Sequence, residues 1–225
     1  MKNSGSKQVM SIIITIIVLN TSLSGCEKQD GASESVGNES ALPIMQSGIM
    51  VKMQSIPVEA LSSEERAGLI FLREEEKLAR DVYNYLHEYY NLNVFINIPK
   101  SEQQHMDAIK FLLDRYKISD PAEGKASGEF INKELQELYN NLIKIGKEGA
   151  AEAIKVGALI EEVDIRDLMN ELENSVDNQD IEYVYNNLIR GSKNHLRAFT
   201  GVLKTYGIVY SPVILEKDFY NEIIQ

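Results

Sequence analysis

The feature that most restricts the fold of this chain is a Glu-x-x-His pair, Glu102 and His105, on a segment with helical apolar periodicity. Three other such segments carry acids or a histidine that also fall on apolar faces: Glu76, Glu161 with Asp164, and His195. A charged group on such a face is costly unless it is paired or bound to a metal. Four helices that direct carboxylates and imidazoles inward are the way a di-metal site is built in a helical bundle.

Apolar residues spaced three and four apart predict helices along most of the chain, and no strand-like alternation competes with them. We expect an all-α fold, a four-helix bundle with one long crossover over residues 59–207, followed by a C-terminal tail over 208–225. A shorter helix, Phe130 to Ile145, is expected in the long crossover between the second and third long helices. Ser62 or Ser63 can cap the first long helix. We expect Asn91 to Ile98 to form a loop and Pro99 to lie in the first turn of the next helix.

Helix geometry predicts which acids of the first long helix face inward, because residues three or four apart share a face. Glu74 is expected to face solvent. Glu75 and Glu76 both border the apolar side, and Glu76 aligns more directly with Leu72 and Tyr83. We therefore choose Glu76 as the inward-facing acid of this helix.

The same argument separates two adjacent acids of the third long helix. Glu161 lies beside Leu168 on the core side, whereas Glu162 lies opposite and four residues before Arg166. We expect Glu162 and Arg166 to form a surface ion pair. Glu161 and Asp164 then repeat the one-turn spacing of Glu102 and His105.

The N-terminal sequence predicts an export signal followed by a tether. Met10 to Leu19 is an apolar run of signal-peptide length, shorter than the ~20 residues of a membrane span. The sequence Leu23-Ser-Gly-Cys26 resembles the lipobox of prokaryotic lipoproteins. That resemblance implies a signal peptide over 1–25, lipidation of Cys26, export, and anchorage to a membrane at the cell surface or its periplasmic face. Residues 26–58 are polar and poor in aromatics, so we expect a disordered tether.

Charge and cysteine content exclude some classes of protein. The formal net charge of −11 argues against a nucleic-acid partner, because binding phosphates requires clustered Lys and Arg. Cys26 is the single cysteine, so neither an intrachain disulfide nor a four-cysteine electron-transfer site can form. An assembly into homo-oligomers is compatible with the sequence.

The helical motifs resemble a known superfamily. Glu76-x-x-Ala79-x-x-x-Tyr83 followed by Glu102-x-x-His105 resembles the first half of the ferritin-like di-iron proteins. Two further stretches, Ile160 to Leu168 and Gly191 to Phe199, resemble a family of uncharacterised prokaryotic proteins, DUF2202. The resemblance implies a ferritin-like fold and favours iron as the metal.

One departure from the superfamily pattern concerns the fourth long helix. Ser192 stands where a second Glu-x-x-His would carry its Glu, and we consider Asp164 as a replacement from the neighbouring helix. The expected metal ligands are four carboxylates and two imidazoles: Glu76, Glu102, His105, Glu161, Asp164 and His195. Loss of the fourth-helix Glu can instead leave one metal position weak.

A mixed Glu/His set without thiolate suits Fe, Mn or Zn, and we expect Fe, two ions per chain. The function expected is that of an exported, lipid-anchored di-iron oxidoreductase acting on Fe(II), O2 or peroxide. Two alternatives stay open: a metal-binding protein without turnover, favoured by Ser192, and a structural or interaction lipoprotein whose core polar groups pair only with each other. Tyr83 is expected to pack in the core or to hydrogen-bond a ligand.

Overall fold

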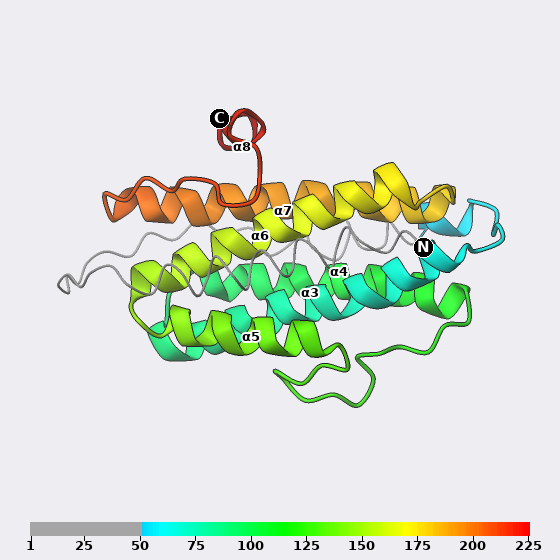
Figure 1. Ribbon diagram of the computed structural model, residues 1–225, viewed down its shortest axis with the longest axis horizontal. Coiled ribbons are helices and arrows are strands. Elements are labelled where there is room, and N and C mark those ends of the chain that lie inside the picture. The colour runs from blue at the N-terminus through cyan, green and yellow to red at the C-terminus, as the bar shows by residue number, and fades with distance from the viewer. Residues whose placement is uncertain (1–50) are drawn as a thin grey trace.

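The computed structural model describes residues 51–225, and this part of the chain is all-helical (Figure 1), which confirms the expected class. Cys26, the expected signal peptide and most of the expected tether lie outside the described residues. The helices are α3 (Ser63–Tyr90), α4 (Val94–Arg115), α5 (Lys133–Gly146), α6 (Ala150–Asn174), α7 (Gln179–Thr205) and α8 (Lys217–Ile224). No helix within 51–225 is both long enough and apolar enough to cross a membrane.

The four long helices pack side by side, with α3 against α4 and α6, and α7 against α4 and α6. Their apolar stripes meet in two clusters of buried side chains. One contains Tyr83, Phe95 and Phe199, and the other contains Leu72 and Leu188. Burial of apolar area of this kind is the main stabilising contribution in a helical protein. The buried acids and histidines of the expected site lie on the same four helices, so polar groups interrupt an otherwise apolar interior.

Capping defines the ends of α3. Ser62 accepts the N–H of Glu65 at 3.0 Å, and the Glu65 carboxylate accepts the N–H of Ser62 at 2.9 Å, which forms a capping box. Asn91 ends the helix in a left-handed conformation and donates its N–H to the carbonyl of His87. The prediction of a cap at Ser62 or Ser63 is therefore confirmed at Ser62.

The start of α4 differs from the expectation. The helix begins at Val94, so the segment Asn91 to Ile98 is largely helical and Pro99 lies inside the helix. Phe95 and Ile98 are buried, and their packing against the core favours helix ahead of the proline. Pro99 lacks the N–H that would bond the carbonyl four residues earlier, a cost that this packing offsets.

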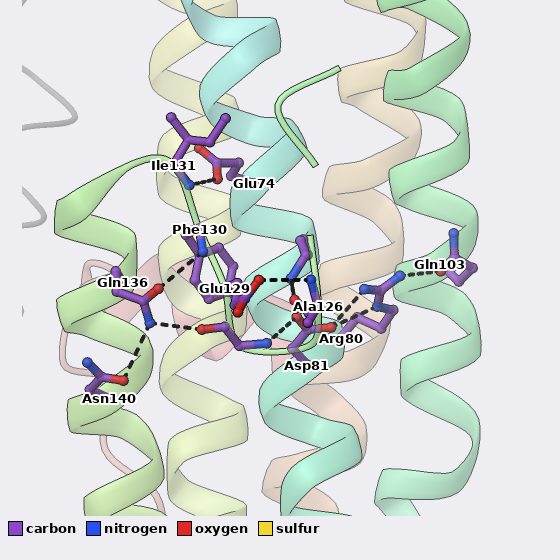
Figure 2. Close-up of polar contacts among 12 residues, drawn as sticks. Glu74, Arg80, Asp81, Gln103, Ala126, Glu129, Phe130, Ile131, Gln136 and Asn140 are labelled. Atoms are coloured by element: carbon purple, nitrogen blue, oxygen red, sulfur yellow. Dashed lines mark hydrogen bonds and ion pairs between the residues drawn. The ribbon is translucent and has the colours of Figure 1, made fainter. Parts of the chain in front are cut away.

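Residues 116–149 connect α4 to α6 and include α5, which packs against α3 and α6 (Figure 1). Glu74 holds this connection in place. Its side chain is 2% exposed, and its carboxylate accepts the N–H group of Ile131 at 2.5 Å (Figure 2). It also accepts the N–H group of Asn132 at 3.0 Å. The expectation that Glu74 faces solvent is wrong, because the connection covers that side of α3.

A buried ion pair within α3 also holds this connection in place. Asp81 accepts hydrogen bonds from Lys77 at 2.5 Å, from Arg80 at 2.8 Å and from the N–H of Gly128 at 2.9 Å. Lys77 also donates to the carbonyl of Ala126 at 2.8 Å (Figure 2). These contacts satisfy the buried charges and fix the loop that leads into α5.

The C-terminal tail is attached through Glu162, which is fully buried. Its carboxylate accepts the hydroxyl of Tyr210 at 2.6 Å and the N–H groups of three consecutive residues at 2.8 to 3.0 Å: Val213, Ile214 and Leu215. The expected surface pair of Glu162 with Arg166 is therefore wrong. Helix periodicity alone could not reveal that residues 208–215 cover this side of α6 before α8 begins.

Residues 51–56 lie within the range expected as a tether, yet they contact the helices. Met53 is fully buried in the cluster that contains Leu72, and Arg115 donates to the carbonyl oxygens of Met53 and Ile56. Ordered structure therefore begins ahead of the first long helix.

Candidate metal centre

The six expected ligands come from all four long helices and are all buried. Glu76 extends from α3, Glu102 and His105 from α4, Glu161 and Asp164 from α6, and His195 from α7. The four carboxylates are at most 1% exposed and the two imidazoles 8% exposed. Helix periodicity predicted this placement for each of the six positions.

Glu102 lies between the two histidines. Its Oε2 is 2.8 Å from Nδ1 of His105, and its Oε1 is 2.8 Å from Nδ1 of His195. Each imidazole meets a second carboxylate, with Glu76 Oε2 3.1 Å from His105 and Glu161 Oε2 3.5 Å from His195. The structure thus contains two triads that share Glu102, and in each triad the potential ligand atoms lie within 4.8 Å of one another.

The two imidazoles present the same nitrogen to the carboxylates and stack with ring centroids 5.5 Å apart. The other nitrogen of His195, Nε2, lies 3.0 Å from the hydroxyl oxygen of Ser101. With a metal on Nδ1, Nε2 would carry the proton and donate a hydrogen bond to Ser101, the kind of supporting contact that orients a ligating histidine. His105 Nε2 faces Gly191, where a Cβ atom would lie only 2.4 Å away. A glycine at 191 therefore makes room for the His105 ring.

Asp164 lies beside the triads without belonging to either. It is 1% exposed, and neither carboxylate oxygen has a hydrogen-bond partner among residues 51–225. Burial raises the pKa of Asp164 well above its usual value, and the negative charges of Glu76, Glu75, Glu161 and Glu102 raise it further. An unpaired buried carboxylate of this kind requires either a proton or a cation.

The ionisation of the centre follows from burial and from the pairing of acids with imidazoles. Burial raises the pKa of Glu76 and of Glu161 to about 7 against the opposing effect of the histidines. Burial acts in the same direction on Glu102, but the imidazoles of His195 and His105 outweigh it and hold the pKa of Glu102 below its usual value. Burial lowers the pKa of His195, and Glu102 with Glu161 more than reverses this and raises it to about 10.

Tyr83 and Ser192 complete the surroundings. The hydroxyl of Tyr83 donates to Glu161 Oε1 at 2.7 Å, while its ring packs against Phe95 and Phe199. Both expectations for Tyr83, core packing and contact with a candidate ligand, therefore hold. Ser192 is fully buried, and its hydroxyl donates to the carbonyl of Leu188 at 3.2 Å. The serine is satisfied by its own helix and adds no carboxylate to the centre.

Comparison with known proteins gives a family. The model of an uncharacterised protein domain, DUF2202, matches residues 65–225. The chain belongs to the DUF2202 family. The DUF2202 chain is 48% identical over 172 residues to the uncharacterised protein MJ0754 of Methanocaldococcus jannaschii, covering 76% of this chain and 92% of that protein.

A crystal structure of the hypothetical protein MJ0754 has a fold similar to that of this DUF2202 protein. The two superpose with a TM-score of 0.74 at 49% identity, over 76% of this chain and 97% of the other. The name of MJ0754 states no activity.

The structure of the DUF2202 protein also contains buried acids that the sequence argument did not select. Glu75 and Asp167 are each 3% exposed, and Glu171 is half-buried. Their spacing was a usable signal, because Asp167 follows Asp164 by three residues and Glu171 follows Asp167 by four. Glu75 was recognised at the border of the apolar side and set aside in favour of Glu76.

The donor set of the DUF2202 protein fits metal ions. Buried carboxylate and imidazole groups are suitable ligands for Fe, Mn or Zn. Oε2 of Glu161 and both carboxylate oxygens of Asp164 lack a hydrogen-bond donor within the described range, as expected where a cation completes the set. Four carboxylates with two neutral imidazoles would also balance the charge of two divalent cations.

Proposed function

We propose that this DUF2202 protein is a ferritin-like four-helix bundle that binds two iron ions and acts as an oxidoreductase on Fe(II), O2 or peroxide. The arrangement of the helices supports the ferritin-like part of the proposal. The connection over 116–149 returns the chain along the molecule, so α4 and α6 run in the same direction (Figure 1). Ferritin-like bundles have one such crossover.

The observation that carries the function is the position of Glu102 between the two histidines. Because its two oxygens each lie 2.8 Å from a different imidazole, Glu102 would hold metal together with both His105 and His195. Glu76 and His105 would complete the ligands on one side, and Glu161 and His195 those on the other. Asp164, with both oxygens unpartnered in the described structure, would supply the remaining carboxylate.

Iron bound in this set would supply one-electron oxidation of Fe(II) coupled to the reduction of O2 or peroxide. The chain's own residues would prepare the site for it. Ser101 fixes the orientation of His195, Tyr83 donates to Glu161, and Gly191 leaves room for His105. The apolar cluster around Tyr83, Phe95 and Phe199 excludes water from one side of the centre.

The N-terminal sequence supports an exported protein anchored by lipid on Cys26, with the folded part carried outside the cytoplasm. Incorporation of radiolabelled fatty acid by cells that express the full chain would test this anchor. Loss of the label in Cys26→Ser is expected, and equal labelling of both proteins would contradict it.

A second candidate function is metal binding without turnover, and Ser192 favours it. Its hydroxyl is committed to the carbonyl of Leu188, so α7 contributes only His195 to the centre. A centre with fewer bridging carboxylates can retain a metal and support little chemistry.

Steady-state consumption of O2 or peroxide by the full-length chain with excess Fe(II) separates the two candidates. We expect sustained turnover in the parent and in His87→Gln, and its loss in His105→Gln. His87 is the matched control, because it is the third histidine of the chain and lies in the last turn of α3, outside both triads. Binding of iron without turnover in the parent would support the second candidate instead.

A further inference from the structure

A row of acids leads along one face of α6 toward the candidate metal centre. The row consists of residues spaced three, three and four apart: Glu161, Asp164, Asp167 and Glu171. Such spacings place side chains on one face with Cβ atoms about 5–6 Å apart. Glu171 is half-buried near the end of α6, whereas Asp167 and Asp164 are buried. The row therefore begins at a residue that water reaches and ends inside the centre.

Glu75 faces this row from α3. It is 3% exposed, and neither of its oxygens has a hydrogen-bond partner in the part of the chain that the structure describes. Its carboxyl group lies within reach of that of Asp167, and the two can hydrogen-bond only when one of them carries a proton. It also lies close enough to Glu171 to feel its charge. A carboxylate from a second helix thus stands opposite the middle of the row.

At the outer end of the row, the side chain of Glu171 packs closely over Gly68 of α3. A Cβ atom at residue 68 would lie 2.6 Å from Glu171 Oε2 and 3.5 Å from the hydroxyl oxygen of Tyr185. Tyr185 is fully buried, and within residues 51–225 its hydroxyl has no hydrogen-bond partner. A buried hydroxyl without a partner indicates a position for a ligand or its water, because such groups are otherwise satisfied.

Comparison with other buried acids of the same protein shows that this row has no evident structural role. Glu65, Glu74 and Glu162 each accept backbone N–H groups from a distant segment. By contrast, both oxygens of Glu75, one of Asp167 and one of Glu171 accept no hydrogen bond from the described residues. Burying unpaired carboxylates is costly, so their placement favours a cation as the missing partner.

We infer that Glu171, Asp167 and Glu75 form a route by which divalent cations pass from solvent to the metal centre, with Tyr185 lining its outer end. This inference rests on the proposed metal-binding function. The potential ligand atoms of these three acids do not form a compact triad such as those around Glu102. These acids would therefore pass a partly hydrated cation from one carboxylate to the next and would not form a fixed binding site.

The test measures how fast the full-length metal-free chain takes up Co²⁺, a redox-inert substitute for Fe(II). Stopped-flow absorbance of the cobalt bands gives the rate. The route variant is Asp167→Asn with Glu171→Gln. The control for loss of surface charge is Glu173→Gln, which removes one negative charge at an exposed position near the end of the same helix. Final cobalt content per chain is measured for every protein.

We expect the route variant to load more slowly, on the order of ten-fold, because a less negative path attracts and coordinates cations less well. Its final cobalt content should match that of the parent, which also shows that it is folded. The control should load at the parental rate. An Asp167→Glu variant, which keeps the charge, should recover most of the rate.

Two other results have different meanings. Parental loading rates in the route variant would overturn the route and leave the metal centre standing. Absence of cobalt uptake by the parent itself, or equal uptake by a Glu102→Gln variant, would overturn the proposed centre and the route together.

Discussion

His195 Nδ1 and Glu102 Oε1 lie 2.8 Å apart, although the two residues are 93 positions apart in the sequence and belong to different helices. The contact joins α7 to α4 in the buried interior, where an ion pair must be well compensated to persist. Because Glu102 meets His105 in the same way, one carboxylate organises both triads. The proposed dinuclear centre depends on this shared residue.

The stability of the metal-free protein should fall as the pH rises from about 4 to about 7. Burial raises the pKa of Asp167 from 3.8 to about 7, so the folded state favours its protonated form. Its stabilising contribution is present below pH 3.8 and is lost as the pH rises through about 7. Glu76 and Glu161 shift in the same direction. Urea unfolding in chelator between pH 4 and 8 measures this trend.

Asp167→Asn should weaken that pH dependence. The amide cannot ionise, so the variant should be more stable than the parent at pH 8 in chelator, by on the order of a few kcal/mol. Near pH 4 the two proteins should differ little. A variant less stable than the parent at pH 8 would show that the charged Asp167 has a structural partner.

Glu162→Gln should loosen the C-terminal tail and leave the metal centre intact. The carboxylate accepts backbone N–H groups of residues 213–215, and an amide can satisfy them only in part. We expect a loss of about 2–3 kcal/mol in unfolding free energy. Hydrogen exchange should accelerate at residues 213–215. A fall in metal content in the same variant would contradict the separation of the tail from the centre.

Gly191→Ala should weaken metal binding by displacing the imidazole of His105. The new Cβ would lie 2.4 Å from His105 Nε2, so the imidazole must shift away from its present position. A displaced ligand should reduce metal affinity, by roughly 10- to 100-fold. Gly201→Ala is the control, because it adds the same methyl group to the same helix in open space. Isothermal titration with Mn²⁺ compares the two, and equal affinities would count against His105 as a ligand.

Ser192→Glu should strengthen the centre by restoring the second Glu-x-x-His spacing with His195. Ser192 is fully buried on α7, and a carboxylate there would add negative charge to the ligand set. With metal bound, we expect a higher midpoint of thermal unfolding and faster Fe(II) oxidation than in the parent. Calorimetry with and without metal measures the first effect. A metal-free variant that is less stable than the parent is also expected, since the new charge is then unpaired.

The sequence was sufficient to predict α3 to α7 and the burial of the six candidate ligands, because both depend on periodicity within a single helix. Ser62 and its capping box were predictable for the same local reason. The sequence did not predict α8, which lies in the expected tail. The expectations for Glu74 and Glu162 failed because their partners are the N–H groups of residues 131–132 and 213–215. Those irregular segments cover faces that a helical wheel assigns to solvent. The start of α4 was misplaced because tertiary burial of Phe95 and Ile98 outweighs the usual preference of proline for the first turn.

The most direct test of the central claim is the iron content of the full-length chain after anaerobic loading with Fe(II) and removal of free metal. The parent and His87→Gln should each retain about two irons per chain, and Glu102→Gln with His105→Gln should retain none. Iron absent from the parent, or equal iron in the site variant, would contradict a dinuclear centre organised by Glu102.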